Sequence, residues 1–419
     1  MTALTRWVCV VAAVVGVLAF GTRAADAQGA QGFAERGFIE GTYTFFPHKT
    51  PNDTDQHVGD GLFREEFFIK PSKWLQLAAG FDVRANSHNQ VDTTWRLDWD
   101  DRTILRPAAA VRRLAATFTA RHLAIDIGKQ FIRWGNADIL NPTDRFAPRD
   151  YLNVISTDLL PVIGGRASVQ FGAESFEAVW IPHFTPSRLP LFGQRWTVLP
   201  PEAAGLTIVD GGSVFPKGSQ QGARWRHAGE HFEVSASIFD GFYNLPNFDI
   251  QPVDTETVRL VRVFPVLRAY GGELSIPTSV VTLKAEAEAF TSPGTTNREF
   301  ILYVVELERQ TGEWMLSGGY IGESVTRSGV GFRFAPDEGL ARSFIGRAAY
   351  TVDPTKSVTI EGAVRQTGDG AYVRGEFSDA FSSHWRVTFA GVGITGKDTD
   401  FIGQYHLNSN VSMTLRVSF

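Results

Sequence analysis

The last nine residues of the chain, VSMTLRVSF (Val411 to Phe419), alternate between apolar and polar side chains without interruption. In an extended strand, successive side chains point to opposite faces. One face of this stretch would therefore be purely apolar and the other purely polar. The apolar set is Val411, Met413, Leu415, Val417 and Phe419, and the polar set is Ser412, Thr414, Arg416 and Ser418.

An alternating terminal strand that closes on Phe resembles the last strand of bacterial outer-membrane barrels. The resemblance implies that the barrel-assembly machinery recognises the chain through Phe419. A soluble β-sandwich could end in a similar strand. The opposite end of the chain helps to decide between these two folds.

The N-terminus, MTALTRWVCVVAAVVGVLAFGTRAADAQ, has the pattern of a secretory signal peptide. Arg6 supplies a positive charge, Val8 to Phe20 form an apolar run, and Ala25 to Ala27 offer a small-x-small cleavage pattern. We expect residues 1–27 to be removed and residues 28–419 to form a single barrel domain. Because the apolar run is short and is not repeated, no membrane helix is expected in the mature chain. The predicted location is the outer membrane, with the lipid bilayer as a partner.

The composition agrees with an exported β protein. The chain has 41 Gly and 12% aromatic residues, and its only cysteine, Cys9, lies in the predicted leader. The mature chain would therefore form no disulfide. A formal net charge of −5 leaves no basic footprint for nucleic acid, so nucleic-acid binding is not expected.

Further segments repeat the period of two, and turn residues such as Pro71-Ser72, Thr311-Gly312 and Asp353-Pro354 separate such segments. Their apolar faces would meet lipid and their polar faces a wet interior. We therefore predict an all-β, antiparallel transmembrane barrel of roughly 14 to 18 strands, with about 16 favoured and with irregular lumen-facing segments. The alternating segments are Leu75 to Arg84, Val91 to Asp100, Val281 to Ala289, Val358 to Arg365 and Phe401 to Asn408.

The segment GKQFIRWGNADILNPTDRFAPRDY, Gly128 to Tyr151, interrupts this pattern. Asn141-Pro142 and Ala147-Pro148 prevent the strand from continuing. Its acidic and basic side chains nearly balance, so they could pair with one another and with polar lumen groups without a bound ion. We expect a structural plug or constriction in the lumen, with direct substrate contact as the alternative. The candidate residues are Arg133, Trp134, Asp138, Asn141, Asp144, Arg145, Arg149 and Asp150.

A second irregular segment runs from Pro182 to Gln221. Its apolar side chains, which include Leu189, Phe192 and Trp196, would be poorly soluble in water. We expect the segment to fold against the barrel wall or into the lumen, and we add Phe192 and Trp196 to the constriction candidates. A capping loop with a small hydrophobic core of its own is the alternative.

The first irregular segment also resembles a known family. Gly128-Lys129-Gln130, Trp134-Gly135, Asn141-Pro142-Thr143-Asp144 and Leu159-Leu160-Pro161 are similar to a signature of proteobacterial outer-membrane proteins of unknown function. The likeness covers about Phe63 to Trp196. It implies a barrel that moves hydrophobic molecules across the envelope, with periplasmic lipid-transport or exporter components as partners. No catalytic residue can be carried over from it.

Two patterns could suggest a metal site. His227 to His231, HAGEH, fits H-x-x-E-H of zinc peptidases, but Gly229 and the alternating flanks favour a hairpin turn over the required helix. His57 lies near Asp53, Asp55 and Asp60, without the spacing of a calcium hand. A solvated extracellular loop is the preferred interpretation, with weak divalent binding as a minor alternative. We therefore predict no metal site, no cofactor and no catalytic residue.

The resulting functional prediction is an outer-membrane channel or transporter, not an enzyme, with a partly plugged lumen. Its solutes would be small and hydrophobic or amphipathic. An outer-membrane hydrolase is one alternative, because a Ser/His or Asp/His pair could meet only in space. A barrel for assembly or surface interaction, without transport, is the other.

Overall fold

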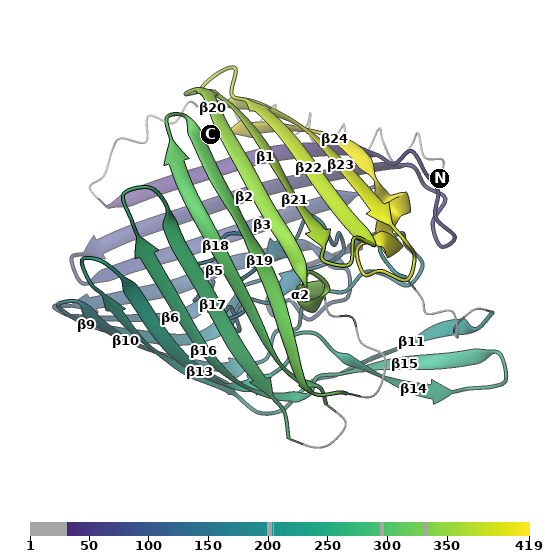
Figure 1. The fold of residues 1–419 in the computed structure, drawn as a ribbon, viewed down its shortest axis with the longest axis horizontal. Helices are drawn as coiled ribbons and strands as arrows, with labels where there is room; N and C mark the ends of the chain where they lie inside the picture. The colour runs from purple at the N-terminus through teal and green to yellow at the C-terminus, as the bar shows by residue number, and fades with distance from the viewer. Residues whose placement is uncertain (1–31, 199–202, 204, 294–296, 330–333, 335) are drawn as a thin grey trace.

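The structure is a computed structural model that describes residues 32–198, 203, 205–293, 297–329, 334 and 336–419 (Figure 1). The predicted signal peptide, residues 1–27, lies outside these described residues. Within them, no helix combines the length and the apolar character needed to cross a membrane.

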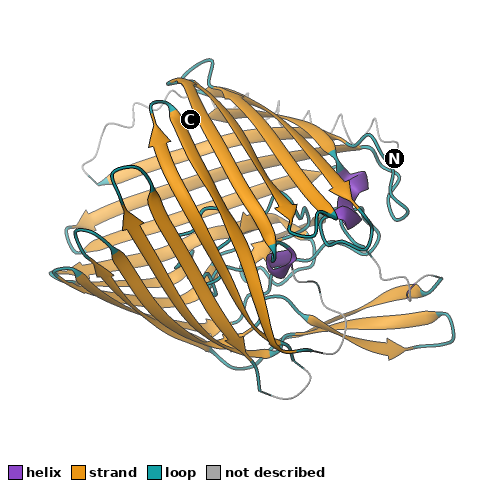
Figure 2. Cartoon of the chain, viewed as in Figure 1, coloured by secondary structure: helices purple, strands orange, loops and turns teal. Residues whose placement is uncertain are grey.

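Eighteen strands form a closed antiparallel barrel (Figures 1 and 2). Closure comes from the first and last strands, which pair from Phe38 with Ser418 to Phe45 with Val411. The barrel strands are β1 (Phe33–Phe45), β2 (His57–Ser72), β3 (Leu75–Asn86), β5 (Arg106–Ala120), β6 (Leu123–Gln130), β9 (Val162–Phe171), β10 (Glu174–His183), β12 (Gln220–Ala228), β13 (Glu233–Phe242), β16 (Val266–Pro277), β17 (Thr282–Thr291), β18 (Glu299–Thr311), β19 (Trp314–Arg327), β20 (Ser343–Asp353), β21 (Lys356–Arg365), β22 (Gly370–Asp379), β23 (Trp385–Gly396) and β24 (Asn410–Ser418).

The predicted fold class is confirmed, but the favoured count of 16 strands is wrong. The structure has 18 because many strands are joined by turns of very few residues. Only Arg121 and His122 separate β5 from β6, and only Gly312 and Glu313 separate β18 from β19. Such economical turns leave enough chain for two more strands.

The outer face of the barrel is apolar. Ile127, Trp180, Ile360 and Phe344 are each more than half exposed, although they lie in regular strands. A protein in water rarely exposes so continuous an apolar surface, whereas lipid requires it. The closed barrel therefore lies in the outer membrane, as predicted. On β24 the polar Ser412, Thr414 and Arg416 line a cavity of the lumen, which confirms the alternation predicted for that strand.

The two ends of the barrel differ. One end has only short turns and the chain terminus Phe419, and bacterial barrels place this end in the periplasm. The other end carries the long connections. These include β4 (Val91–Asp98), which pairs in parallel with the first part of β5, and the short pair β7 (Arg149–Asp150) and β8 (Asp158–Leu159).

A three-stranded sheet stands away from the barrel at the extracellular end (Figure 1). Its order is β11-β15-β14, from β11 (Thr207–Val214), β15 (Thr257–Val263) and β14 (Asn247–Pro252). Two short helices, α2 (Pro336–Gly339) and η2 (Gly403–Asn408), lie in other extracellular connections. The strand expected at Phe401 to Asn408 is therefore wrong, since this stretch alternates in sequence but mostly forms η2.

Candidate functional site

The connection from β6 to β9, residues 131–161, folds into the lumen. The beginning of this connection contacts its middle. Asp144 accepts a hydrogen bond from the Trp134 backbone N–H at 2.7 Å and forms an ion pair with Arg133 at 3.1 Å. Gly135 allows this turn, since a Cβ there would lie 2.3 Å from the Cβ of Asn141. The predicted inward fold of this segment therefore has a local cause in its own side chains.

The connection packs first through aromatic contacts. Trp134 is 3% exposed and meets Phe146 edge-on, with 5.0 Å between ring centroids. Phe146 in turn meets Phe239 of β13 at 5.1 Å. The Trp134 indole N–H also donates to Glu177 of β10. These contacts hold the connection against the wall from β9 to β18, which we call the filled half of the lumen.

Buried carboxylates of the filled half anchor the backbone of the connection. Glu286 of β17 accepts hydrogen bonds from the Thr143 N–H and hydroxyl, both at 2.8 Å, and from the N–H groups of Asn136 at 3.2 Å and Ala137 at 3.3 Å. Glu306 of β18 accepts from the Asp138 N–H at 3.0 Å. Irregular backbone leaves N–H groups without ladder partners, so these carboxylates replace the missing strand.

Side-chain ion pairs complete this anchoring. Arg145 pairs with Glu288 of β17 at 2.9 Å, and Lys284 of the same strand lies 3.4 Å from Asp138. The predicted charges of the segment thus pair mainly with the wall, whereas among the described residues only Arg133 and Asp144 of the segment pair with each other.

A buried chain of charges joins the connection to its neighbours. Asp150 contacts Arg106 of β5 at 2.8 Å and Arg188 at 3.4 Å, while Arg188 and Lys129 both contact Asp101, at 2.9 and 2.6 Å. Burial alone would raise the pKa of Asp150, but the positive charges of Arg106 and Arg188 outweigh it and hold the pKa well below its usual range. Asp150 is therefore an ionised structural anchor.

The second irregular segment divides between two places. Trp196 is 3% exposed, packs on Tyr405 with 5.7 Å between ring centroids and lines the lumen. Phe192 instead contacts Phe248, in a separate cluster with Leu189 and Leu260 beneath the outer sheet. Phe192 lines neither cavity described below, so the structure does not bring it to the other constriction candidates. The described part of this segment thus contributes to the lumen through Trp196 and to a separate hydrophobic cluster through Phe192.

The opposite wall, β20 to β24 and β1 to β3, is the open half of the lumen, and two cavities lie along it. The first has a volume of about 310 Å³ at the extracellular side. Polar and apolar groups share its lining about equally, and the candidates Asp138, Asn141, Asp144, Arg145 and Arg149 contribute polar groups together with Thr157, Ser187, Asn244 and Glu361. Its aromatic residues are Tyr151, Phe242, Tyr243, Tyr372, Phe401 and Tyr405.

Arg149 differs from Arg145, the other arginine at this cavity among the described residues. Its guanidinium lies 3.4 Å from the Thr157 hydroxyl, and within the described part of the chain it takes part in no salt bridge. Arg145, by contrast, is paired with Glu288. The first cavity thus combines aromatic rings and the carboxylates of Asp138, Asp144 and Glu361 with one guanidinium, Arg149, that forms no salt bridge among the described residues.

The second cavity, about 420 Å³, is polar and shares the lining residue Ile155 with the first. Hydroxyl groups from β1, β23 and β24 alternate there with charges that are already paired. Arg416 lies 2.7 Å from Glu40, Arg374 lies 2.7 Å from Glu376, and Arg84 lies 3.1 Å from Asp158. Paired charges of both signs give such a wall little preference for one sign of ion.

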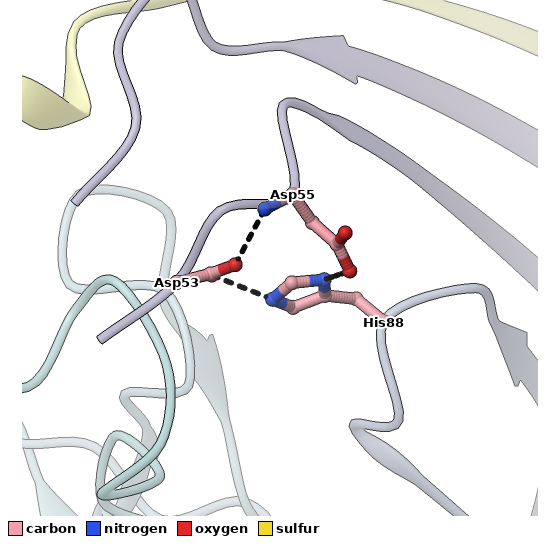
Figure 3. Close-up of side chains that lie close together, drawn as sticks. All are labelled: Asp53, Asp55 and His88. Atoms are coloured by element: carbon pink, nitrogen blue, oxygen red, sulfur yellow. Dashed lines mark hydrogen bonds and ion pairs between the residues drawn. The ribbon is translucent and has the colours of Figure 1, made fainter. Parts of the chain in front are cut away.

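The structure treats the two patterns that could suggest a metal site, His227 to His231 and His57 with its neighbouring aspartates, differently. His227 lies at the end of β12 and pairs with Glu174 at 2.6 Å, and the turn after it closes through the Gly229 N–H to the Phe232 carbonyl, as predicted for a hairpin. His57 bonds with the Tyr43 hydroxyl at 2.7 Å. Asp53 and Asp55 instead meet His88, which follows β3 (Figure 3). Sequence spacing could not reveal that meeting, because the residues belong to different loops.

Several residues of the lumen escaped prediction. The inward direction of Glu286 and Glu288 followed from the alternation of β17, but their role as anchors did not. Arg106 and Arg188 carried no sequence signal, since each acts through partners on distant segments, and Tyr405 was expected on the lipid-facing side of a strand.

Comparison with known proteins supports the fold. No known family model and no curated protein matches the chain by sequence. Among solved structures, it is similar to OccAB4 of Acinetobacter baumannii, with 9% identity, a TM-score of 0.55 and coverage of 94% of this chain and 99% of that chain. OpdQ of Pseudomonas aeruginosa gives 11% identity and 0.53, covering 93% and 98%.

A BenF-like porin of Pseudomonas fluorescens Pf-5 gives 10% identity and a TM-score of 0.54, covering 93% of this chain and 97% of that chain. Such low identities establish likeness of fold, and the fold is that of outer-membrane porins. The resemblance to a family of unknown function, based on the Asn141 to Asp144 signature, stays a prediction.

Proposed function

We propose that the protein is a passive outer-membrane channel for small amphipathic molecules. The observation that carries this proposal is the aromatic cavity with Arg149, which adjoins the polar cavity at Ile155. The porin fold supports a channel, and the anchored connection supports a lumen that is narrowed on one side only.

The lining favours a particular kind of solute. Aromatic rings such as Tyr151 and Tyr243 offer apolar contact to the body of a solute, and Arg149 offers a charge to an anionic or strongly polar group. Conduction requires that such binding be weak enough to allow release. The second cavity meets this need, because its hydroxyl groups and paired charges give only weak, distributed contacts.

Flux through the purified protein in liposomes tests the proposal. Phenylpropionate and its uncharged amide have about the same size. Passage of both therefore reports on the open channel, and a difference between them reports on the charge interaction with Arg149. We expect both to pass, and Arg149→Ala to slow the anion about tenfold while the amide is little changed, since a hydrogen bond to a charged group contributes about 1.5 kcal/mol or more. Arg268→Ala is the control, because Arg268 is exposed and lines neither cavity.

The two results contradict different parts of the proposal. Equal anion flux through wild type and Arg149→Ala would remove the role of Arg149. If neither solute passes the wild-type protein, the channel itself is refuted and a barrel without transport is favoured.

A hydrolase has less support. The described residues include one serine hydroxyl beside an imidazole, Ser383 with His384 at 2.8 Å, in an exposed periplasmic turn. No carboxylate among the described residues forms an ion pair with His384 to orient it, as a catalytic triad requires.

Recognition by the barrel-assembly machinery is also part of the proposal. Phe419 is 40% exposed and stacks on Phe63 with 6.3 Å between ring centroids. Its ring is thus available on the outer surface while its backbone pairs with Gly37. Deleting Phe419 should lower the amount of folded barrel in cells, with Trp74→Ala at the same rim as the control. The proposed periplasmic transport partners rest on the family resemblance alone.

A further inference from the structure

Asp53, Asp55 and His88 form a cluster at the extracellular mouth (Figure 3). Asp53 and Asp55 belong to the connection between β1 and β2, and His88 follows β3. The Nε2 atom of His88 lies 2.8 Å from Oδ2 of Asp53. A carboxylate only accepts hydrogen bonds, so the proton of this contact with Asp53 lies on Nε2 of His88.

The other nitrogen of His88 faces a second carboxylate. Nδ1 lies 3.4 Å from Oδ2 of Asp55. With its proton on Nε2, a neutral imidazole presents a lone pair at Nδ1, and Asp55 presents lone pairs to it. Two acceptors at this distance repel each other unless a cation lies between them. The separation also suits two neighbouring ligands of one metal ion, whose bonds to nitrogen and oxygen are about 2.0 to 2.2 Å long.

The charges around the cluster favour a cation. Arg195 Nε lies 3.5 Å from Oδ2 of Asp53, and the Arg195 backbone N–H donates to the same oxygen at 3.2 Å, so Asp53 is largely neutralised. The Asp55 side chain is 70% exposed, and its one salt bridge among the described residues is with His88, although the charge of Arg195 also acts on it. A net negative charge therefore remains beside Nδ1.

We propose that Nδ1 of His88 and the carboxylate of Asp55 bind a divalent transition metal of the zinc class, with water completing the coordination. Asp53 orients the imidazole from its far side, as carboxylates do for most metal-binding histidines. Imidazole together with carboxylate and water suits Zn²⁺, Ni²⁺ and Cu²⁺ better than Ca²⁺ or Mg²⁺. The ion would clamp two extracellular loops together at the rim of the polar cavity, which His88 and Arg195 line.

Isothermal titration of the purified, untagged protein in detergent with Zn²⁺ tests this assignment. We expect one Zn²⁺ per chain, at least tenfold weaker binding in Asp55→Asn and His88→Gln, and about tenfold weaker binding in the orienting variant Asp53→Asn. His57→Gln is the matched control, because His57 lies at the start of β2 and bonds with Tyr43 instead. Asp55→Asn is the decisive variant, since so exposed a side chain can be changed without disturbing the fold.

Three outcomes overturn the proposal. If the wild-type protein binds no Zn²⁺, a proton rather than a metal lies between His88 and Asp55. If Asp55→Asn binds Zn²⁺ as tightly as the wild type, the ion sits elsewhere. Loss of Zn²⁺ binding in His57→Gln would show that the ion binds near His57, at the β1 and β2 side of the loop, instead of at His88.

Discussion

The two halves of the lumen satisfy their charges in different ways. In the filled half, carboxylates such as Glu286 and Glu306 accept hydrogen bonds from the backbone of the inward connection. In the open half, Arg416 pairs with Glu40 and Arg374 with Glu376 on the wall itself, although Arg84 of β3 pairs with Asp158 of the inward connection. The comparison shows that the charged side chains of a lumen wall determine whether a loop packs inside the lumen. Where the wall leaves acceptors unmatched, a loop docks, and where the wall matches its own charges, space remains.

The largest effect on the difference between the two halves is expected when a short Gly/Ser turn replaces Asp138 to Asp150. Without the docked connection, the filled half would open to water, and single-channel conductance in a planar bilayer should rise several-fold. A turn of the same kind in place of Val253 to Glu256, at the tip of the outer sheet, is the control and should leave conductance unchanged. Unaltered conductance in the first variant would mean that the connection does not narrow the channel.

Asp150→Asn should lower the free energy of unfolding by about 3 to 5 kcal/mol, because it leaves Arg106 and Arg188 buried without their shared charge. Since the folded pKa of Asp150 lies below its ordinary value of 3.8, this contribution is complete above that value and is lost as the pH falls toward the folded pKa. Urea unfolding in detergent should show a constant difference from wild type between about pH 5 and 8. A difference that shrinks already in this range would contradict the ionised anchor.

Glu286→Ala and Glu376→Ala compare the two halves directly. Glu286→Ala removes the acceptor of four hydrogen bonds and should lower the free energy of unfolding by about 3 kcal/mol. The single-channel conductance should also fluctuate as the connection detaches from the wall. The second removes one partly exposed ion pair and should cost less than about 1 kcal/mol. Thermal unfolding followed by gel mobility measures both. Equal losses of unfolding free energy in the two variants would show that charged side chains contribute equally to stability in both halves of the lumen.

The smallest effect is expected from Arg416→Gln. Glu40 loses its partner, so the polar cavity gains one net negative charge while the fold is hardly affected. The reversal potential in a salt gradient should shift slightly toward cation selectivity. Glu40→Gln should shift it in the opposite direction, and a shared direction for the two variants would rule out a simple charge effect.

Much of the fold could be read from the period of two, since a strand between lipid and water must alternate. The same period misled at Phe401 to Asn408, where buried Tyr405 belongs to η2 and packs on Trp196. Asn141-Pro142 correctly indicated an interrupted strand that enters the lumen. Phe192 was misplaced because apolar character alone does not tell which of two cores a side chain joins. Glu306, Arg188 and His88 were beyond prediction as site residues, because their partners lie far away in the sequence.

The seam between β1 and β24 also decides when the barrel can form. The Thr42 and Thr414 hydroxyls meet there at 2.9 Å although 372 positions separate them. A contact of such long sequence separation has a large loop-closure cost and forms slowly. Until β24 arrives, β1 presents an unpaired edge, which is a template for aggregation. The edge of β1 is therefore protected only once β24 has paired with it, so the unclosed chain is the form most exposed to aggregation.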